Sequence, residues 1–300
     1  MAESSVLKIA LLTALAMVAF AANSVLNRVA LAGGEADALG YTGIRLASGA
    51  LMLGLILAWR GRRPRWGRMG GSMGGALALF LYAIAFSYAY LDLAAGTGAL
   101  LLFAAVQLGM LGWAIGHGDR PGAVEWAGFT VAVLFLIFLV LPGVSAPDPL
   151  GAALMILAGL AWAAYTLLGH GSAAPLVDTG GNFLRCLPIA LLLILPGLFE
   201  QTISPAGWLY AIASGALASG LGYAVWYSVL PALERSTAAY VQLTVPAIAA
   251  GGGVLFIAEP LTLRLVLCSL GILGGVALAL WGADQRKRRI GRAGPAARSS

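Results

Sequence analysis

The stretch AFAANSVL at residues 19–26 decides the fold, because AWAAYTLL at residues 161–168 repeats it. The two stretches agree in their small residues and in the positions of their rings, at an offset of about 142 residues. Further along the chain, Arg45 is matched by Arg185, so the offset changes by only a residue or two. The sequence therefore predicts a duplicated unit with small changes in its loops.

The composition places both copies in a membrane. The chain is 60% hydrophobic and 10% charged, with a mean hydropathy of +0.91. About a quarter of the residues of a soluble protein are charged, so this chain has too little polar surface to cover a soluble globule. We expect an all-α integral membrane protein. Cys186 and Cys268 both lie in apolar runs, and we expect them to pack as free thiols.

The hydrophobic core of a bilayer is about 30 Å thick and needs about 20 apolar residues per helix. This measure predicts ten transmembrane helices, at 7–28, 38–59, 71–91, 96–115, 124–142, 150–169, 180–198, 206–230, 236–257 and 261–282. They form a first five-helix repeat (1–145) and a second (146–283), followed by a basic cytoplasmic tail (284–300). Since each repeat has an odd number of helices, the second starts from the opposite face, and the two repeats are inverted.

The charges predict the orientation. Arginines and lysines gather in the loop 60–68 and the tail 286–298. By the positive-inside rule both segments lie in the cytoplasm, so both termini are cytoplasmic in a multi-pass protein of the cell inner (plasma) membrane. The acidic loops with Glu35, Asp37, Asp148 and Glu200 then lie outside. This clustering also argues against nucleic acid as a partner. The first apolar segment has features of a signal peptide, but its match to 161–168 predicts that it is retained.

Several kinds of site are absent from the predicted helices. No carboxylate lies near the middle of any of them, although a buried acid is the usual group for binding protons or organic cations in a bilayer. This argues against a multidrug cation exporter and predicts transport that is not obligatorily coupled to protons. Neither His117 nor His170 belongs to a nucleophile, zinc or acid-pair motif. We therefore predict no catalytic residues, no metal and no cofactor.

Aromatic residues occur instead near the membrane midplane. Tyr82, Phe86 and Tyr90 stand at i, i+4 and i+8, on one face of the third predicted helix. Tyr223 and Tyr227 repeat the first two positions on the eighth helix. Ordinary helix packing, or anchoring at the interface in the case of Tyr90, is the alternative interpretation. Repetition at matched positions favours substrate binding by Tyr82, Phe86, Tyr223 and Tyr227.

Rings and amides on four other helices complete the candidate substrate-binding set. They are Phe20 and Asn23 on the first helix, Gln107 on the fourth, Trp162 and Tyr165 on the sixth, and Tyr240 and Gln242 on the ninth. Hydrogen bonds between helices are the alternative role for such amides. Pro246 interrupts the ninth helix and releases backbone carbonyls, which is tolerated where helices line a cavity or can form new hydrogen bonds. We expect helices one, three, four, six, eight and nine to line the cavity.

Arg45 and Arg185 are matched basic residues in the second and seventh helices. Inversion places Arg45 near the outer interface and Arg185 near the inner one. Each side chain either extends to its nearest interface or acts in gating or as an anchor for a carboxylate.

These features together resemble the EamA branch of the drug/metabolite transporter superfamily. The resemblance depends on two inverted sets of five helices, the matched arginines, the Trp162–Ala163 pair and an acid before a proline at Glu259–Pro260. The ring-rich centre without a buried acid is most similar to the YddG-type aromatic amino-acid exporters. One departure is that the first repeat has Ala104–Ala105 where the second has Pro246, so the halves need not bend alike.

The sequence therefore predicts a secondary transporter that exports small neutral or zwitterionic metabolites, chiefly amino acids including aromatic ones. Alternating access between the two inverted halves would move them. The alternatives are a carrier for another solute class, such as a nucleotide-sugar, drug or vitamin-like solute, or a channel. A phosphate-bearing substrate would need several buried cations, and the predicted helices offer Arg45 and Arg185. The expected partners are the small-molecule substrate and the lipid bilayer, and the sequence makes no prediction of oligomeric state.

Overall fold

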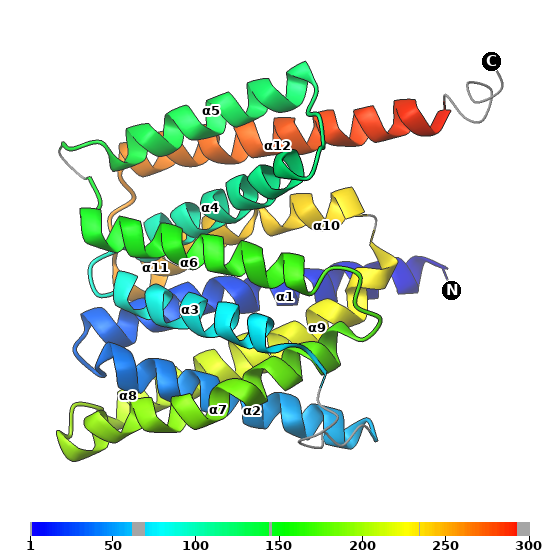
Figure 1. Cartoon of the computed structure of the whole chain (residues 1–300). Helices are drawn as coiled ribbons and strands as arrows, with labels where there is room; N and C mark the ends of the chain where they lie inside the picture. The colour runs from blue at the N-terminus through cyan, green and yellow to red at the C-terminus, as the bar shows by residue number, and fades with distance from the viewer. Residues whose placement is uncertain (1, 62–69, 144–145, 234, 293–300) are drawn as a thin grey trace.

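The computed structural model describes residues 2–61, 70–143, 146–233 and 235–292, and these ranges contain helices and no strands (Figure 1). In chain order the elements are α1 (Ala2–Ala32), α2 (Ala38–Trp59), α3 (Met73–Ala89), α4 (Ala95–Gly116), α5 (Ala123–Val140), α6 (Pro149–Leu168), α7 (Pro175–Phe199), α8 (Pro205–Ile212), η1 (Ala213–Leu221), α9 (Gly222–Val229), η2 (Leu230–Ala232), α10 (Arg235–Gln242), α11 (Val245–Ile257) and α12 (Leu263–Arg292). The prediction of an all-α membrane protein is confirmed.

The predicted membrane helices agree with those of the structure. Within the described ranges, nine helices are long and apolar enough to cross a membrane, and the third predicted one, Met73–Ala89, is a shorter apolar helix. The predicted 38–59 coincides with α2, whereas the predicted 180–198 begins five residues after the start of α7 at Pro175. Many large apolar side chains face outward, among them Leu55 and Phe256, as expected of a surface in contact with lipid.

Two helices of the second half are irregular. The eighth predicted helix contains a π-helical segment, η1, between α8 and α9. The ninth breaks between α10 and α11, directly before Pro246, as the sequence indicated. Its counterpart Ala104–Ala105 lies inside the continuous helix α4. The expectation that the two halves bend differently is therefore met at this position.

Several helices begin at a side-chain cap three residues before a glycine. Asp37 accepts a hydrogen bond from the backbone N–H of Gly40 at 2.7 Å, and Ser72 accepts one from Gly75 at 2.9 Å. Asp148 and Ser204 cap α6 and α8 in the same way. An N-cap oxygen satisfies one of the free N–H groups of the first turn, so these residues fix where the helices start.

The packing of the helices repeats when the two halves are exchanged. α2 packs against α7, and α5 packs against α12. The contact of α3 with α6 corresponds to that of α9 and η1 with α1, and the contact of α4 with α6 corresponds to that of α11 with α1. In Figure 1, α1 and α6 run in opposite directions through the molecule. This arrangement agrees with inverted repeats, while the boundaries at 145 and 283 stay predictions.

One contact between the halves depends on the lack of side chains. A Cβ on Gly128 of α5 would lie 2.5 Å from the carbonyl oxygen of Gly275 in α12, and a Cβ on Gly275 would lie 2.6 Å from the carbonyl oxygen of Gly128. Small residues let membrane helices approach closely, where van der Waals packing holds them together. The glycines at these two positions therefore allow a close contact between α5 and α12.

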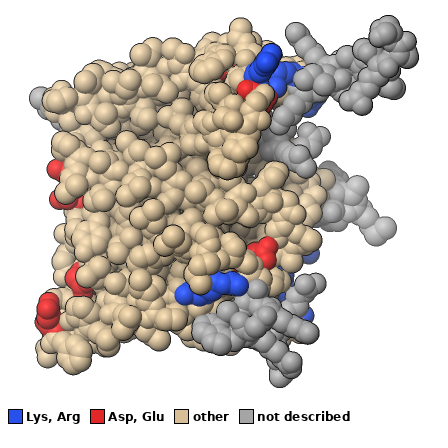
Figure 2. Space-filling model, viewed as in Figure 1, with Lys and Arg blue, Asp and Glu red and all other residues tan. Residues whose placement is uncertain are grey.

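The two ends of the molecule differ in charge. Glu35, Asp37, Asp148 and Glu200 lie in the loops of one end, which we call the acidic end. The start of α1 and the end of α12, together with Arg60 after α2 and Arg286 in α12, lie at the other, which we call the basic end (Figure 1; Figure 2). The predicted basic residues at 62–69 and 293–300 lie outside the described residues. Cys186 and Cys268 are buried and free, as predicted.

Candidate functional site

A cavity of about 390 Å³ lies between the two halves. Its lining comes from α1, α3, α4, α6, α7, α9, η2, α10 and the loop between α6 and α7. That loop lies at the basic end, where Gly169, His170 and Gly171 on the cavity rim are exposed to solvent. Among the described residues, no loop of the acidic end contributes to the lining. The cavity is therefore reached from the basic end.

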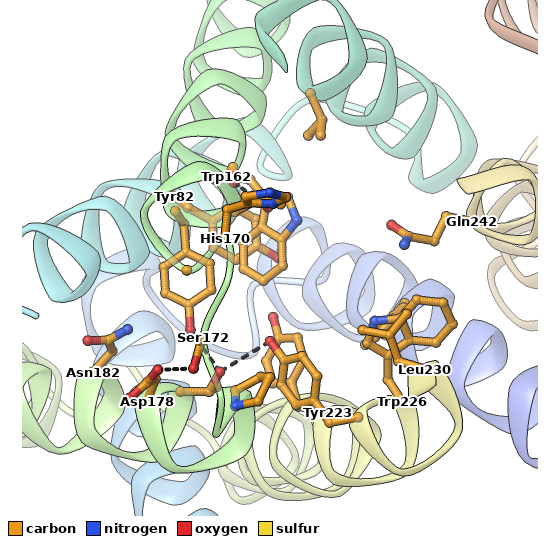
Figure 3. A pocket seen from close by; sticks show the side chains of 18 of the residues that line it. Tyr82, Trp162, His170, Ser172, Asp178, Asn182, Tyr223, Trp226, Leu230 and Gln242 are labelled. Atoms are coloured by element: carbon orange, nitrogen blue, oxygen red, sulfur yellow. Dashed lines mark hydrogen bonds between the residues drawn. The ribbon is translucent and has the colours of Figure 1, made fainter. Parts of the chain in front are cut away.

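Aromatic rings form one continuous wall of the cavity. Trp162 lies at its centre, with its ring centroid 4.8 Å from that of Tyr82 and 5.8 Å from that of Tyr223. Phe86 extends the wall from Tyr82 at 5.2 Å, and Tyr227 extends it from Tyr223 at 6.2 Å. The two predicted stripes of rings thus meet through Trp162, and Figure 3 shows Tyr82 and Trp162 on one side of the cavity. Such a wall can stack against a flat solute.

The matched residue Phe20 lies in the same cavity. Its ring is 5.6 Å from that of Tyr223 and 6.1 Å from that of Trp226. Trp226 and Gln242 lie across the cavity from Tyr82 (Figure 3). Tyr90, the third member of the first stripe, does not line the cavity and packs edge-to-face against Phe86 at 4.7 Å.

Polar groups concentrate on α7 near the rim. The hydroxyl of Tyr165 donates to the hydroxyl of Thr179 at 3.0 Å, and Thr179 in turn donates to the hydroxyl of Tyr227 at 3.2 Å. Asp178 accepts from the backbone N–H of Gly71 at 2.7 Å and from the hydroxyl of Ser172. The hydroxyls and the carboxylate give a solute several hydrogen-bond partners beside the aromatic wall.

Asn23 makes hydrogen bonds between helices, which was the alternative role, while its role in substrate binding stays a prediction. It lines the cavity, and its side-chain oxygen accepts a hydrogen bond from Ser214 at 2.7 Å and another from Ser219 at 3.4 Å. Both serines belong to the π-helical segment η1, and they contact α1 through these hydrogen bonds. The amide of Asn27 also donates to Ser214, at 3.4 Å. Asn23 is therefore fixed by a buried polar network that joins the two halves.

The two matched arginines do different things. Arg45 is 3% exposed, and its Nη2 donates to the hydroxyl of Tyr82 at 2.9 Å. It does not extend to an interface. Arg185 donates from Nη1 to the carbonyl oxygen of Gly70 at 2.6 Å and so ties α7 to the start of α3 at the basic end. Neither arginine lines the cavity.

An ion pair joins the two halves at the acidic end. Arg28 of α1 lies 3.1 Å from Glu259, which follows α11, and Arg28 also donates to the carbonyl oxygen of Leu91 at 2.7 Å. The other carboxylate oxygen of Glu259 accepts from the backbone N–H of Ala95 at 2.9 Å. Further contacts link the α1–α2 loop to the segment before α8, through Thr202 with Asp37 and Ser204 with Glu35. These contacts close the acidic end.

The structure brings nearly all the predicted substrate-binding residues to one cavity. They are Phe20, Asn23, Tyr82, Phe86, Trp162, Tyr165, Tyr223, Tyr227 and Gln242. Gln107 and Tyr240 are not among the lining residues. Gln107 follows Val106, which does line the cavity, and Tyr240 packs toward Leu243 and Val276 on the side of α12. Helix seven, absent from the predicted lining helices, contributes as well.

The sequence interpretation missed several residues on α7 and α9. Asp178, Thr179 and Asn182 line the cavity, but a span predicted to start at 180 left the first two outside the membrane. Pro175 was the available signal, because proline is favoured in the first turn of a helix. Trp226 was overlooked although it lies three residues after Tyr223, on the same helix face.

Comparison with known proteins identifies the family of this chain. An uncharacterized protein of Pseudomonas aeruginosa is 53% identical over 283 residues, which cover 94% of this chain and 96% of that protein. The threonine/homoserine exporter RhtA of Escherichia coli K12 is 32% identical over 237 residues, covering 74% of this chain and 75% of RhtA. The model of the EamA-like transporter family matches residues 149–281. The chain belongs to the EamA-like transporter family.

Membership of the EamA-like transporter family makes this chain a membrane transporter and not an enzyme. The matched residues 149–281 fall within the predicted second repeat. A crystal structure aligns with a TM-score of 0.59 over 89% of this chain and 97% of the other, at 19% identity. That likeness supports the fold alone.

Proposed function

We propose that this protein exports amino acids, aromatic ones included, by alternating access between its two halves. The observation that carries the proposal is the continuous aromatic wall centred on Trp162, with rings from both halves facing one cavity. A cavity of about 390 Å³ falls in the range usual for sites that bind small molecules. The relative RhtA is named an exporter of threonine and homoserine, which supports amino acids as the solute class.

The polar lining supports a small neutral or zwitterionic solute over a phosphate-bearing one. Among the described residues, the cavity wall contains no lysine or arginine. A nucleotide-sugar would lack the direct cationic partners that phosphate groups require. Closure of the acidic end by Arg28 and Glu259 supports a carrier over a channel, since a channel needs a continuous path.

The direction of export depends on the orientation in the membrane. We place the basic end in the cytoplasm by the positive-inside rule, which makes the described state open to the cytoplasm. In a variant without native cysteines, Gly33→Cys and Arg60→Cys should react with an impermeant maleimide from opposite sides of the cell inner membrane. Arg60 represents the basic end in this experiment because Ser299, at the predicted cytoplasmic C-terminus, lies outside the described residues. Reaction of both cysteines from one side would contradict this orientation.

Counterflow in proteoliposomes tests the solute class. Vesicles loaded with unlabelled phenylalanine, tryptophan, threonine or homoserine should take up the same labelled amino acid transiently above equilibrium. A nucleotide-sugar should not produce this effect. Only a carrier shows counterflow, so uptake without it would indicate a channel, and counterflow of the nucleotide-sugar alone would contradict the proposed solute class.

Substitutions in the aromatic wall test how the cavity recognises rings. Trp162→Ala, Tyr82→Ala and Tyr223→Ala should weaken phenylalanine more than threonine, since each aromatic pair contributes about 0.5–1.5 kcal/mol beyond its buried area. Trp126→Ala is the matched control, because Trp126 faces outward on α5 and is 51% exposed. Equal losses for both solutes, in variants that still fold, would indicate that the rings only pack.

A further inference from the structure

Arg45 is an unusual residue because its positive charge is buried without an anion beside it. Among the described residues it has no acidic partner within ion-pair distance, whereas Arg28 and Arg286 both contact carboxylates. A guanidinium stays protonated in proteins. Its Nη1 is buried and has no hydrogen-bond partner in the described part of the chain. Burying a donor or a charge without a partner is costly, so a purely structural role is a poor explanation.

The surroundings of Arg45 lead to the cavity. Its guanidinium carbon lies 5.2 Å from the ring centroid of Tyr82 and 4.8 Å from that of Phe86. Both rings line the cavity. The positive charge therefore lies behind the aromatic wall at about the distance of a cation–π contact. Because the dielectric is low in this apolar interior, the charge of Arg45 interacts electrostatically with a solute on the cavity side of the aromatic wall.

The hydrogen bond to Tyr82 gives the charge a direct route to a solute. The hydroxyl of Tyr82 accepts from Arg45 at 2.9 Å, which leaves its own proton available to donate. Accepting a bond from a cation polarises the hydroxyl and makes it a stronger donor. A carboxylate in the cavity is a fitting acceptor for that proton, while an ammonium group is repelled from this part of the wall.

The opposite charge lies nearer the rim. Asp178 lines the cavity in the first turn of α7, at the basic end, while Arg45 lies in the part of α2 nearer the acidic end. The cavity thus has a carboxylate toward its mouth and a guanidinium behind its inner wall. A zwitterion fits this arrangement with its ammonium group toward Asp178 and its carboxylate toward Tyr82.

We propose that Arg45, acting through the Tyr82 hydroxyl, selects solutes with a carboxylate and rejects cations that lack one. This inference rests on the proposed function, and it names the chemical group that the cavity recognises. Arg45 acts here as a specificity-determining residue that does not itself line the cavity.

The test compares phenylalanine with phenylalaninamide, which keeps the ring and the ammonium group but lacks the carboxylate. Each competes for uptake of labelled phenylalanine into proteoliposomes. In the wild type the amide should compete about tenfold more weakly or worse, as expected for a lost hydrogen bond to a charged group. In Arg45→Gln the two competitors should differ by no more than about threefold. Tyr82→Phe keeps the ring and should lose much of the same preference.

Two control variants and three possible outcomes make the test decisive. Arg45→Lys keeps the charge and should retain a preference for the acid, and Arg185→Gln, at the matched position away from the cavity, should leave the ratio of acid to amide unchanged. A wild type that transports phenylalanine without preferring it to the amide would overturn this inference alone. An unchanged preference in both Arg45→Gln and Tyr82→Phe would do the same. A wild type that transports no amino acid would overturn the proposed function, and this inference with it.

Discussion

The two ends of this transporter are built differently. At the acidic end, Arg28 and Glu259 form an ion pair between the halves, and their remaining groups bind backbone atoms of the α3–α4 region. At the basic end two ion pairs join Arg286 of α12 to Asp119 and Glu125 of the α4–α5 region, beside the cavity. The acidic end is closed by contacts between the two halves, whereas the ion pairs of the basic end lie beside the cavity and do not close it.

This difference indicates which contacts change during transport and which do not. To open the acidic end, Arg28 must separate from Glu259. The Arg286 cluster can stay intact in both states, because it joins α12 to the start of α5, and these two helices pack against each other outside the cavity. We therefore expect substitutions at the two ends to act on different properties, namely the balance between states at one end and the stability of the fold at the other.

The largest effect is expected from Glu259→Gln, which removes the charge of the ion pair but keeps an acceptor for the N–H of Ala95. A partly buried pair of this kind contributes about 1–2 kcal/mol to the closed state. Ser24→Cys in a variant without native cysteines reports opening, because Ser24 lines the cavity. Its reaction with an impermeant maleimide from the acidic side should become about tenfold faster.

The control for this experiment is Asp284→Asn, which removes an exposed pair with Arg288 within α12. It should leave the rate of labelling unchanged. If Glu259→Gln labels no faster than this control, the ion pair does not hold the acidic end closed.

Arg286→Gln should have no effect on labelling of the cavity, and should lower the stability of the fold instead. Glu125 is 3% exposed and is paired with Arg286 at 2.7 Å, so the substitution leaves a buried carboxylate without its cation. Thermal unfolding in detergent should shift to lower temperature, by an amount that corresponds to about 2–3 kcal/mol. Labelling of Ser24→Cys from the acidic side should stay at the rate of the unsubstituted parent. A rise in that rate would erase the distinction between the two ends.

Thr202→Val should give a smaller change at the acidic end than Glu259→Gln. Thr202 donates to the carboxylate of Asp37 at 2.7 Å, and this contact is exposed. An exposed hydrogen bond contributes about 0.5–1 kcal/mol or less, so labelling of Ser24→Cys should rise by no more than about fivefold. An effect as large as that of Glu259→Gln would mean that closure is shared equally between both sides of the acidic end.

The smallest expected effect is that of a pH gradient on net transport. The acids of the described part lie in loops or near helix ends, apart from Asp284 in the last third of α12, and Glu125 and Glu259 both contact arginines. Protonation therefore has no isolated midplane carboxylate to act on. Net phenylalanine flux should follow the solute gradient with or without a pH difference. Accumulation driven by pH alone, and lost in Glu259→Gln or Glu125→Gln while exchange persists, would show that a helix-end acid couples transport to protons.

The sequence predicted what the bilayer imposes and missed what the packing decides. Membrane thickness fixes the length of apolar runs, so 38–59 and 96–115 agree closely with α2 and α4. The internal repeat indicated that Tyr82 and Tyr223 face one site. How far each helix is rotated about its own axis depends on the helices packed against it, and the sequence does not show this. Gln107 and Tyr240 were for this reason assigned to a cavity that they do not line.

The irregular regions were harder to predict for a related reason. The π-helical segment η1 is stable where Ser214 and Ser219 bind Asn23 on another helix, and hydropathy carries no sign of such a contact. The polar start of α7 lowered its hydropathy and hid Asp178 and Thr179. Polar residues needed for a cavity weaken the very signal by which membrane helices are found in a sequence.

The short helix α3 has a consequence for the lipid around the protein. Its 17 residues extend only about 26 Å, less than the roughly 30 Å of a typical hydrocarbon core. Met73, Leu77 and Leu81 form an exposed row on it, so lipid meets this helix directly. A bilayer that matches this helix by thinning does so at a cost of a fraction of a kcal/mol per Å. Since α3 carries Tyr82 and Phe86, hydrophobic mismatch acts on the helix that holds the aromatic wall, and acyl-chain length becomes a variable that tunes transport.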